Sequence, residues 1–211
     1  MRSRHAIAAV AIGALVALAG CSATSASGTS PSTASGGAGP SSSSSAAPST
    51  SAPATTVPSA TVLSSAEQAD LKLLHEQERA GLDAFSVFAA RFPSQPVFAN
   101  LTSSQKIQLT TVTAMLVRYG LGDPSTGLAA GTYAVPAVQQ LYDATVAAGT
   151  SADHALDAVE HFEEQNLASL QAARTHTTRA DLTLMYTNLE LASHAHIAAC
   201  TVALQHAASR A

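Results

Sequence analysis

The chain has 211 residues, of which 46% are hydrophobic, 4% aromatic and 11% charged, and its formal net charge is −4. An acidic chain with so few basic residues lacks the positive patch of nucleic-acid-binding proteins, so nucleic acid is not an expected partner. The sequence also contains no Gly-rich phosphate loop, no Gly-x-Ser-x-Gly and no His-Glu-x-x-His. Nucleotide-binding and common hydrolase functions are therefore not indicated.

The first 20 residues have the organisation of a secretion signal. Arg2, Arg4 and His5 precede an apolar run over residues 6–19, which is shorter than the roughly 20 residues of a membrane-spanning helix. The run ends in Leu18-Ala19-Gly20-Cys21, which resembles the lipobox of bacterial lipoproteins. That resemblance implies cleavage before Cys21, a lipid on the new N-terminus, and a location on the extracytoplasmic side of the cell membrane. The alternative is an ordinary signal peptide in which Cys21 is incidental.

Residues 22–62 are almost entirely Ser, Ala, Thr, Pro and Gly and include no charged residue. Such a composition cannot bury enough apolar surface to offset the entropy lost on ordering, so we expect a disordered tether over residues 21–62. The remaining segment, 63–211, has the length of one ordinary domain. With Cys21 lipidated, Cys200 is the one remaining thiol, so no internal disulfide is expected.

Helical periodicity and helix-end signals predict an all-α domain. Ser64 and Glu67 form a capping box, Gly120 and Gly149 end helices, and Pro136 begins one. Residues 121–135 contain Asp123-Pro124, Gly127 and Gly131, which predict an irregular crossover. A four-helix bundle with a long crossover and a short extra helix accounts for this order. The predicted helices are 64–91, 98–119, 136–148 (the short extra helix), 151–175 and 178–207.

Each of the four long helices has an apolar seam, meaning core-facing residues that recur at alternating steps of three and four. Every seam includes polar side chains: Glu78 in the first helix, Gln105 and Gln108 in the second, Glu163 in the fourth and His196 in the fifth. An unpaired buried amide costs about 1–3 kcal/mol, so these groups are expected to meet in a shared polar centre. The alternative is that some of them lie at seam edges. The four seams are Leu71, Leu74, Glu78, Leu82, Phe85, Phe88; Leu101, Gln105, Gln108, Val112, Met115, Tyr119; Leu156, Val159, Glu163, Leu167, Leu170; and Leu182, Met185, Leu189, Ala192, His196, Cys200, Ala203.

The sequence gives weaker predictions for the remaining His residues and for Cys200. His75, His161, His194 and His206 lie beside the seams and are expected to be solvated, although His161 with Glu164, or His75 with Glu78, has the one-turn spacing of a ligand pair. Cys200 is expected to be a small buried hydrophobe.

Several short motifs, taken together and in order, resemble an uncharacterised bacterial and archaeal family of ferritin-like domains. The segment from His75-Glu76-Gln77-Glu78-Arg79 through Asp83-Ala84-Phe85 is similar to the family's Glu-Glu-x-Lys-Leu-Ala-x-Asp-Val-Tyr opening. The similarity spans residues 71–196 and implies a ferritin-like four-helix bundle. The other matching positions are Phe98, Asn100 and Leu101; Arg118-Tyr119-Gly120; Asp123-Pro124; Leu141-Tyr142-Asp143; Gly149-Thr150-Ser151; Glu163-Glu164; and Ser193-His194-Ala195-His196.

The departures from this family concern the metal ligands. Where the family has Ser-Glu-Gln-x-His, this chain has Ser104-Gln105-Lys106-Ile107-Gln108, so a Glu-x-x-His pair has become Gln-x-x-Gln. The resemblance implies that Glu78, Glu163 and His196 occupy metal-ligand positions and that Gln105 and Gln108 are replaced ligand positions. Phe85 also replaces the family's Tyr.

Charge decides which metal centre these residues favour. Two ferrous ions carry about four positive charges, and hard cations prefer anionic oxygen ligands. Glu78 and Glu163 supply two negative charges, so a two-iron enzyme centre is not expected, and enzymatic activity is the less favoured reading. One interpretation is a binding or scaffold module whose metal centre is partly degenerate, with an unspecified protein partner. The alternative is a mononuclear protein that binds one iron, manganese, zinc or copper ion through Glu78, Glu163 and His196.

Overall fold

The computed structural model describes residues 62–210, which form five helices and no strand, so the all-α prediction is confirmed. The predicted signal peptide, the lipidation site Cys21 and the tether up to residue 61 lie outside the described residues. The long irregular stretch between the second and third helices is where the crossover was predicted. The helices are α1 (Ser65–Arg91), α2 (Pro96–Arg118), α3 (Pro136–Ala148), α4 (Ala152–Thr175) and α5 (Ala180–Ala208).

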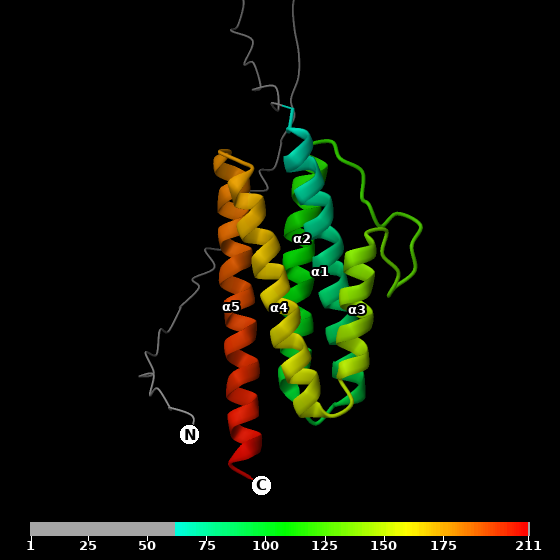
Figure 1. Ribbon diagram of the computed structural model, residues 1–211, viewed down its shortest axis with the longest axis vertical. Coiled ribbons are helices and arrows are strands. Elements are labelled where there is room, and N and C mark those ends of the chain that lie inside the picture. Colours follow the sequence, from blue (N-terminus) through cyan, green and yellow to red (C-terminus); the bar gives the residue numbers. More distant parts are fainter. Residues whose placement is uncertain (1–61, 211) are drawn as a thin grey trace, which may run out of the picture. The chain divides into compact units, whose positions relative to one another are not determined.

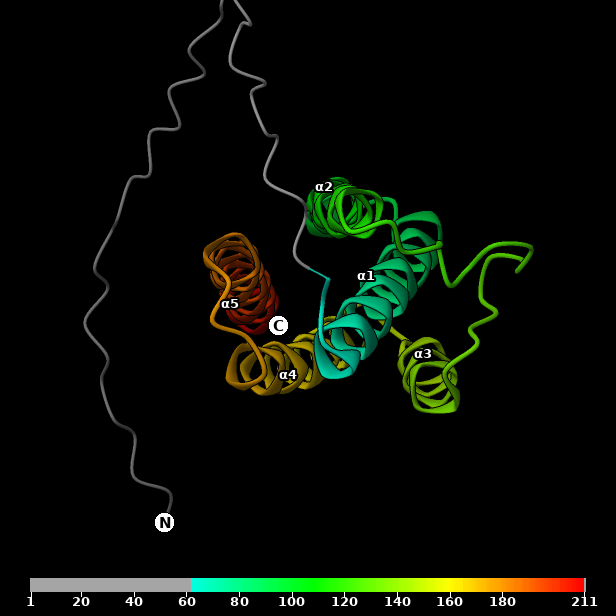
Figure 2. The ribbon, with the colours of Figure 1, turned by 90° about the horizontal axis from the view of Figure 1, so that it is seen from above.

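The four long helices form a bundle (Figures 1 and 2). Helix α1 packs against α2 and α4, and α5 packs against α4 and α2, so the helices follow one another around the bundle in the order α1, α2, α5, α4. Helix α3 lies outside this ring against α1 and α4. Because α3 carries the chain back along the bundle, α2 and α4 run in the same direction and adjacent long helices are antiparallel (Figure 1).

The helix ends follow the predicted signals with small shifts. The capping box at α1 is present, with the Glu67 N–H donating to Ser64 Oγ at 3.2 Å and the Ser64 N–H donating to Glu67 Oε2 at 2.8 Å. Helix α2 begins at Pro96, two residues before its predicted start, because proline has no N–H to leave unpaired in a first turn. Gly120 ends α2 with a φ of 66°, a conformation that glycine adopts without strain.

The core consists of two apolar clusters with the polar seam positions between them along every long helix. One cluster includes Phe85, Phe98 and Phe162, and the other includes Leu74 and Leu182. The seams predicted for α4 and for most of α1 and α5 are buried. In α2 the buried residue is Leu116 rather than the predicted Met115, because a 3.6-residue turn drifts away from a strict seven-residue repeat.

His75 departs from the expectation that it is solvated, since it is only 3% exposed. Its Nε2 lies 3.1 Å from Thr113 Oγ1 of α2, and its Nδ1 faces the carboxylate of Asp123 at 3.5 Å. Burial lowers the pKa of His75, while the charge of Asp123 acts to raise it. The crossover covers His75, and helical periodicity alone does not show such a contact.

The crossover is fixed to the side of α1 by three charged side chains. The backbone N–H groups of Ala134 and Val135 donate to the two carboxylate oxygens of Glu76 at 2.9 and 2.8 Å. One turn further along α1, Arg79 donates to the Thr132 carbonyl at 2.9 Å. Asp83 then accepts from the Tyr133 hydroxyl at 2.7 Å and from the Gly131 N–H at 2.9 Å. These contacts hold the crossover against the bundle, although the crossover contains no helix or strand of its own.

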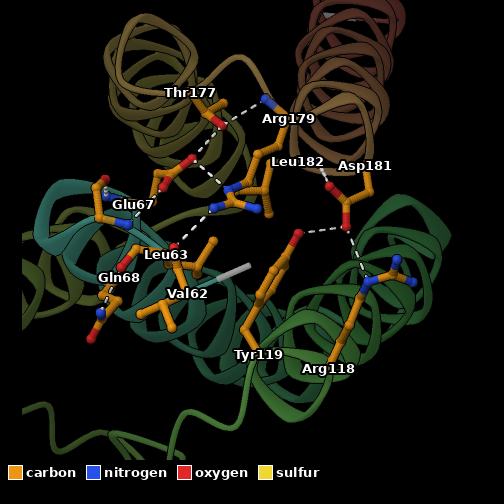
Figure 3. Close-up of polar contacts among 11 residues, drawn as sticks. Val62, Leu63, Glu67, Gln68, Arg118, Tyr119, Thr177, Arg179, Asp181 and Leu182 are labelled. Atoms are coloured by element: carbon orange, nitrogen blue, oxygen red, sulfur yellow. Dashed lines mark hydrogen bonds and ion pairs between the residues drawn. The ribbon is translucent and has the colours of Figure 1, made fainter. Parts of the chain in front are cut away.

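Arg179 ties together the end of the bundle at which the domain begins (Figure 3). Its guanidinium donates to Glu67 Oε1 at 3.1 Å and to the Val62 carbonyl at 2.9 Å, and it lies over the ring of Tyr119. The Thr177 hydroxyl donates to the same Glu67 oxygen at 2.6 Å. The start of α1, the end of α2 and the α4–α5 connection are thereby linked, and we call this set of contacts the Arg179 clamp.

None of the helices within residues 62–210 combines the length and the apolar character that a membrane crossing requires.

Candidate functional site: a buried polar centre

The structure brings all five predicted polar seam residues together in the middle of the bundle. Glu78 of α1, Gln105 of α2 and Glu163 of α4 are fully buried, and Gln108 of α2 and His196 of α5 are each 5% exposed. Each side chain contacts at least one other residue of the set. The expectation that the four seams converge at their polar positions therefore agrees with the geometry, and none of the five lies at an exposed seam edge.

Gln105 and Glu78 join the two helices on one side of the centre. Nε2 of Gln105 donates to Oε2 of Glu78 in a short hydrogen bond and lies 3.2 Å from the backbone carbonyl of the same residue. Gly81, one turn along α1, makes room for this contact, since a Cβ there would lie 2.9 Å from Gln105 Nε2 and 3.0 Å from Phe162. A glycine inside a helix, normally unfavourable by about 1 kcal/mol, is thus explained by close packing.

His196 joins Glu163 to Gln108 on the other side. Its Nδ1 lies 2.7 Å from Glu163 Oε1, and its Nε2 lies 3.4 Å from Nε2 of Gln108. In this orientation of the Gln108 amide, its nitrogen can act only as a donor, so Nε2 of His196 is the acceptor. Nδ1 then carries the proton and donates it to the Glu163 carboxylate.

Two further members of the polar centre, Asn166 and Ser193, were not predicted from the sequence. Nδ2 of Asn166 lies 3.1 Å from Glu78 Oε1 and 3.3 Å from Ser193 Oγ, and both residues are fully buried. Asn166 is one turn after Glu163, and Ser193 is one turn before His196, so both share the predicted core-facing seams. The i, i+3 spacing was the signal that could have identified them.

The two carboxylates have different electrostatic surroundings. Burial, followed by the nearby charge of Glu163, raises the pKa of Glu78 to about 8, against the opposing effect of the hydrogen bonds from Asn166 and Gln105. Glu78 therefore carries its proton at neutral pH. The centre then has one negative charge fewer than its two carboxylates would suggest.

The polar centre has buried oxygens that accept no hydrogen bond from the described part of the protein. Three of its oxygens, Glu163 Oε2, Gln108 Oε1 and Asn166 Oδ1, are buried and have no hydrogen-bond partner among the described residues. Unmatched buried acceptors are costly, typically by about 1–3 kcal/mol each. The hydrogen-bond network of the centre is therefore incomplete among the described side chains.

These contacts do not fit the metal centre that the ferritin-like resemblance implies. Both oxygens of Glu78 accept from amides, and both nitrogens of His196 face protein groups, Glu163 and Gln108. Within residues 62–210, no group of three His, Cys, Asp or Glu side chains is placed so that it could hold a metal ion. The side chains instead bond to one another in a hydrogen-bond network, which leaves three of their oxygens without a donor in the part of the chain that the structure describes.

The remaining candidates lie away from this centre. His161 and Glu164 are 3.8 Å apart, but both side chains are well exposed, and His194 and His206 are exposed as predicted. Cys200 is fully buried, and burial raises the pKa of its thiol to about 12, which keeps it protonated and unreactive.

A protein-family model described as "Uncharacterized protein domain (DUF2202)" matches residues 67–210. The chain belongs to the DUF2202 family. The match includes every residue of the polar centre and the three side chains that hold the crossover. The DUF2202 domain is also similar to the uncharacterized protein MJ0754 of Methanocaldococcus jannaschii, with 25% identity over 138 residues, covering 65% of this chain and 74% of the relative.

A crystal structure of the hypothetical protein MJ0754 from the same archaeon has a similar fold. The TM-score is 0.66 at 24% sequence identity, and the match covers 69% of this chain and 83% of the other. At this level of identity the similarity establishes the shared helical fold of the DUF2202 domain and nothing further about chemistry.

Proposed function

We propose that this protein is an extracytoplasmic lipoprotein whose ferritin-like bundle acts as a binding or scaffold module. In this proposal the ancestral metal centre has become a hydrogen-bond network, with Gln105 and Gln108 in former ligand positions. One observation carries the proposal: both nitrogens of His196 and both carboxylate oxygens of Glu78 face protein partners. A buried polar network of this kind fixes the register of the packed helices without adding stability.

Elemental analysis and thermal unfolding of the full chain test this proposal. We expect no stoichiometric iron, manganese, zinc or copper and a melting temperature that a chelator does not change. A ligand that binds the folded state raises the melting temperature with its concentration. One equivalent of a preferred ion with such a rise would instead support the mononuclear alternative, with Glu78, Glu163 and His196 as ligands.

A variant that restores the family motif gives the matched positive control. The double substitution Gln105→Glu and Gln108→His recreates Glu-x-x-His on α2 and adds one carboxylate and one imidazole to the centre. We expect this variant to bind a divalent ion that the parent chain does not bind, and addition of Glu163→Gln to abolish that binding. If the restored motif binds no metal, the interpretation of Gln105 and Gln108 as replaced ligands is wrong.

The lipid anchor rests on the Leu18-Ala19-Gly20-Cys21 motif. Labelling of cells that express the chain with a radioactive fatty acid should label this protein, and Cys21→Ala should remove both the label and the membrane association. Retention of the label in the Cys21→Ala variant would show that the lipid is attached elsewhere.

A further inference from the structure

A groove runs between the first half of α2 and the last third of α5. It is open to solvent and has a volume of about 430 Å³, and its walls are mostly apolar, with Val97 and Leu101 on one side and Ala199, Val202 and Ala203 on the other. The edge of His196 also lines it, so the groove passes beside the polar centre. Its volume lies within the range of about 300–1,000 Å³ that is usual for small-molecule sites.

The groove continues toward the C-terminal end of α5 and changes character there. A second hollow of about 310 Å³ shares Pro96, Val97, Ala203 and His206 with the first and extends to Ser94, Gln95 and Arg210. The two hollows are therefore neighbours, and together we call them the trough, which is apolar near His196 and polar at Arg210.

The charge of this trough differs from that of the whole chain. Its lining includes Arg210 and His206 but no Asp or Glu, although the chain has 14 acidic and 10 basic residues. A guanidinium pairs well with a carboxylate, so Arg210 offers a partner for an anionic group at this end of the trough. A small inorganic anion would leave the apolar walls unused, and a purely apolar molecule would leave Arg210 unused.

We propose that the trough binds a single-chain amphiphile with a carboxylate head group. The head lies beside Arg210 and His206, and the hydrocarbon chain lies between Val97 and Leu101 of α2 and Val202 of α5. Val202 is 50% exposed in the structure and would be covered by the chain of the ligand. His196 lines one edge of the trough, but the proposed contacts with the amphiphile use none of the hydrogen bonds of the polar centre, so the proposal would stand even if the proposed loss of the metal centre were wrong.

Displacement of a dansyl-labelled undecanoic acid from the full chain at neutral pH tests the proposal. Octanoate, decanoate and dodecanoate should compete with affinities that rise about fourfold for each methylene group that the walls cover. Decanol, which has the same chain without the charge, should compete at least about tenfold more weakly than decanoate. Failure of all three carboxylates to displace the label would overturn the proposal, as would equal competition by decanol.

Three variants locate the site. Arg210→Gln should lower the affinity for decanoate about fivefold and leave the affinity for decanol unchanged. Lys106→Gln, which removes an exposed cation elsewhere on α2, should change neither affinity. Ala203→Phe should fill the trough and abolish binding of both. Because Ala203→Phe leaves the apolar run over residues 6–19 intact, unchanged binding in this variant would assign the amphiphile to another part of the chain and overturn the proposal.

Discussion

Glu76 and Glu78 are two residues apart on α1, and both are fully buried, yet their surroundings differ. Glu76 points toward the crossover, where its two oxygens accept from the backbone N–H groups of Ala134 and Val135. Glu78 points into the bundle, where its two oxygens accept from the side-chain amides of Gln105 and Asn166, with Glu163 nearby. The donors to Glu76 are backbone N–H groups, whose direction is fixed by the fold. The donors to Glu78 are side-chain amides, which can reverse their orientation.

This difference indicates that burial alone does not show what a carboxylate contributes. The partners of Glu76 are backbone groups of the crossover, so both of its acceptor oxygens help to hold the crossover in place. The partners of Glu78 are adjustable, and a second carboxylate opposes its charge. The polar centre can therefore lose a charge at little cost, whereas the crossover contact cannot.

The largest expected effect comes from Glu76→Gln. The substitution turns one acceptor oxygen of the fully buried side chain into a donor that faces a backbone N–H of the crossover, which should lower the free energy of unfolding by about 3 kcal/mol. The matched substitution Glu78→Gln should cost less than about 1 kcal/mol at pH 8, because the amides of Gln105 and Asn166 can reorient. Chemical denaturation of the two variants measures both values. Equal losses of stability would contradict the distinction between the two sites.

A smaller effect is expected from pH. The pKa of Glu78 is raised from 4.5 to about 8, so between these values the folded chain holds a proton that the unfolded chain has lost. Stability therefore falls as pH rises through this range. His75 acts in the opposite sense, because its lowered pKa reduces stability as pH falls below its ordinary value of 6.5. Between pH 6.5 and pH 8 the Glu78 contribution should be about 2 kcal/mol, at about 1.4 kcal/mol for each pH unit.

Unfolding curves of three proteins across that range isolate the contribution of Glu78. The Glu78→Gln variant should lose the slope that the unsubstituted chain shows, and Glu76→Gln should keep it despite its lower stability. A slope that persists in Glu78→Gln would assign the pH dependence to another group.

The smallest effect is expected from Gly81→Ala. Alanine favours the helix by up to about 1 kcal/mol, but its Cβ would displace Gln105 and press on Phe162, and such overpacking typically costs about 1–3 kcal/mol. We expect a net loss of about 1 kcal/mol. The added substitution Gln105→Ala should relieve the contact and make Gly81→Ala neutral or stabilising in that background, as a double-mutant cycle would show.

The fold could largely be predicted from the sequence because its signals are local. Apolar residues at helical spacing, the Ser64 and Glu67 capping box, and the glycines and prolines of the crossover are each recognised within one or two turns. The convergence of Glu78, Gln105, Gln108, Glu163 and His196 followed from the same periodicity. The phase of α2 was wrong near Met115, where Leu116 is buried instead, because the helix drifts by about 20° for each seven residues relative to a strict heptad pattern.

What the sequence did not predict depends on contacts between distant segments. The burial of His75 and the roles of Glu76, Arg79 and Asp83 require the position of the crossover, and an irregular segment has no periodicity from which to infer it. Asn166 and Ser193 have the correct spacing, but Asn and Ser are common on helix surfaces as well, so spacing alone did not distinguish them. These sites are defined by which residues contact one another in the fold, and residue type alone does not identify them.

The Arg179 clamp has a mechanical consequence. Because Arg179 holds the Val62 carbonyl and Glu67 from the α4–α5 connection, a force applied to the chain at Val62 passes into two helical hairpins at once. The first turn of α1 and the α4–α5 connection would therefore bear that force together. A domain pulled from its N-terminal side would resist extension until these contacts separate together.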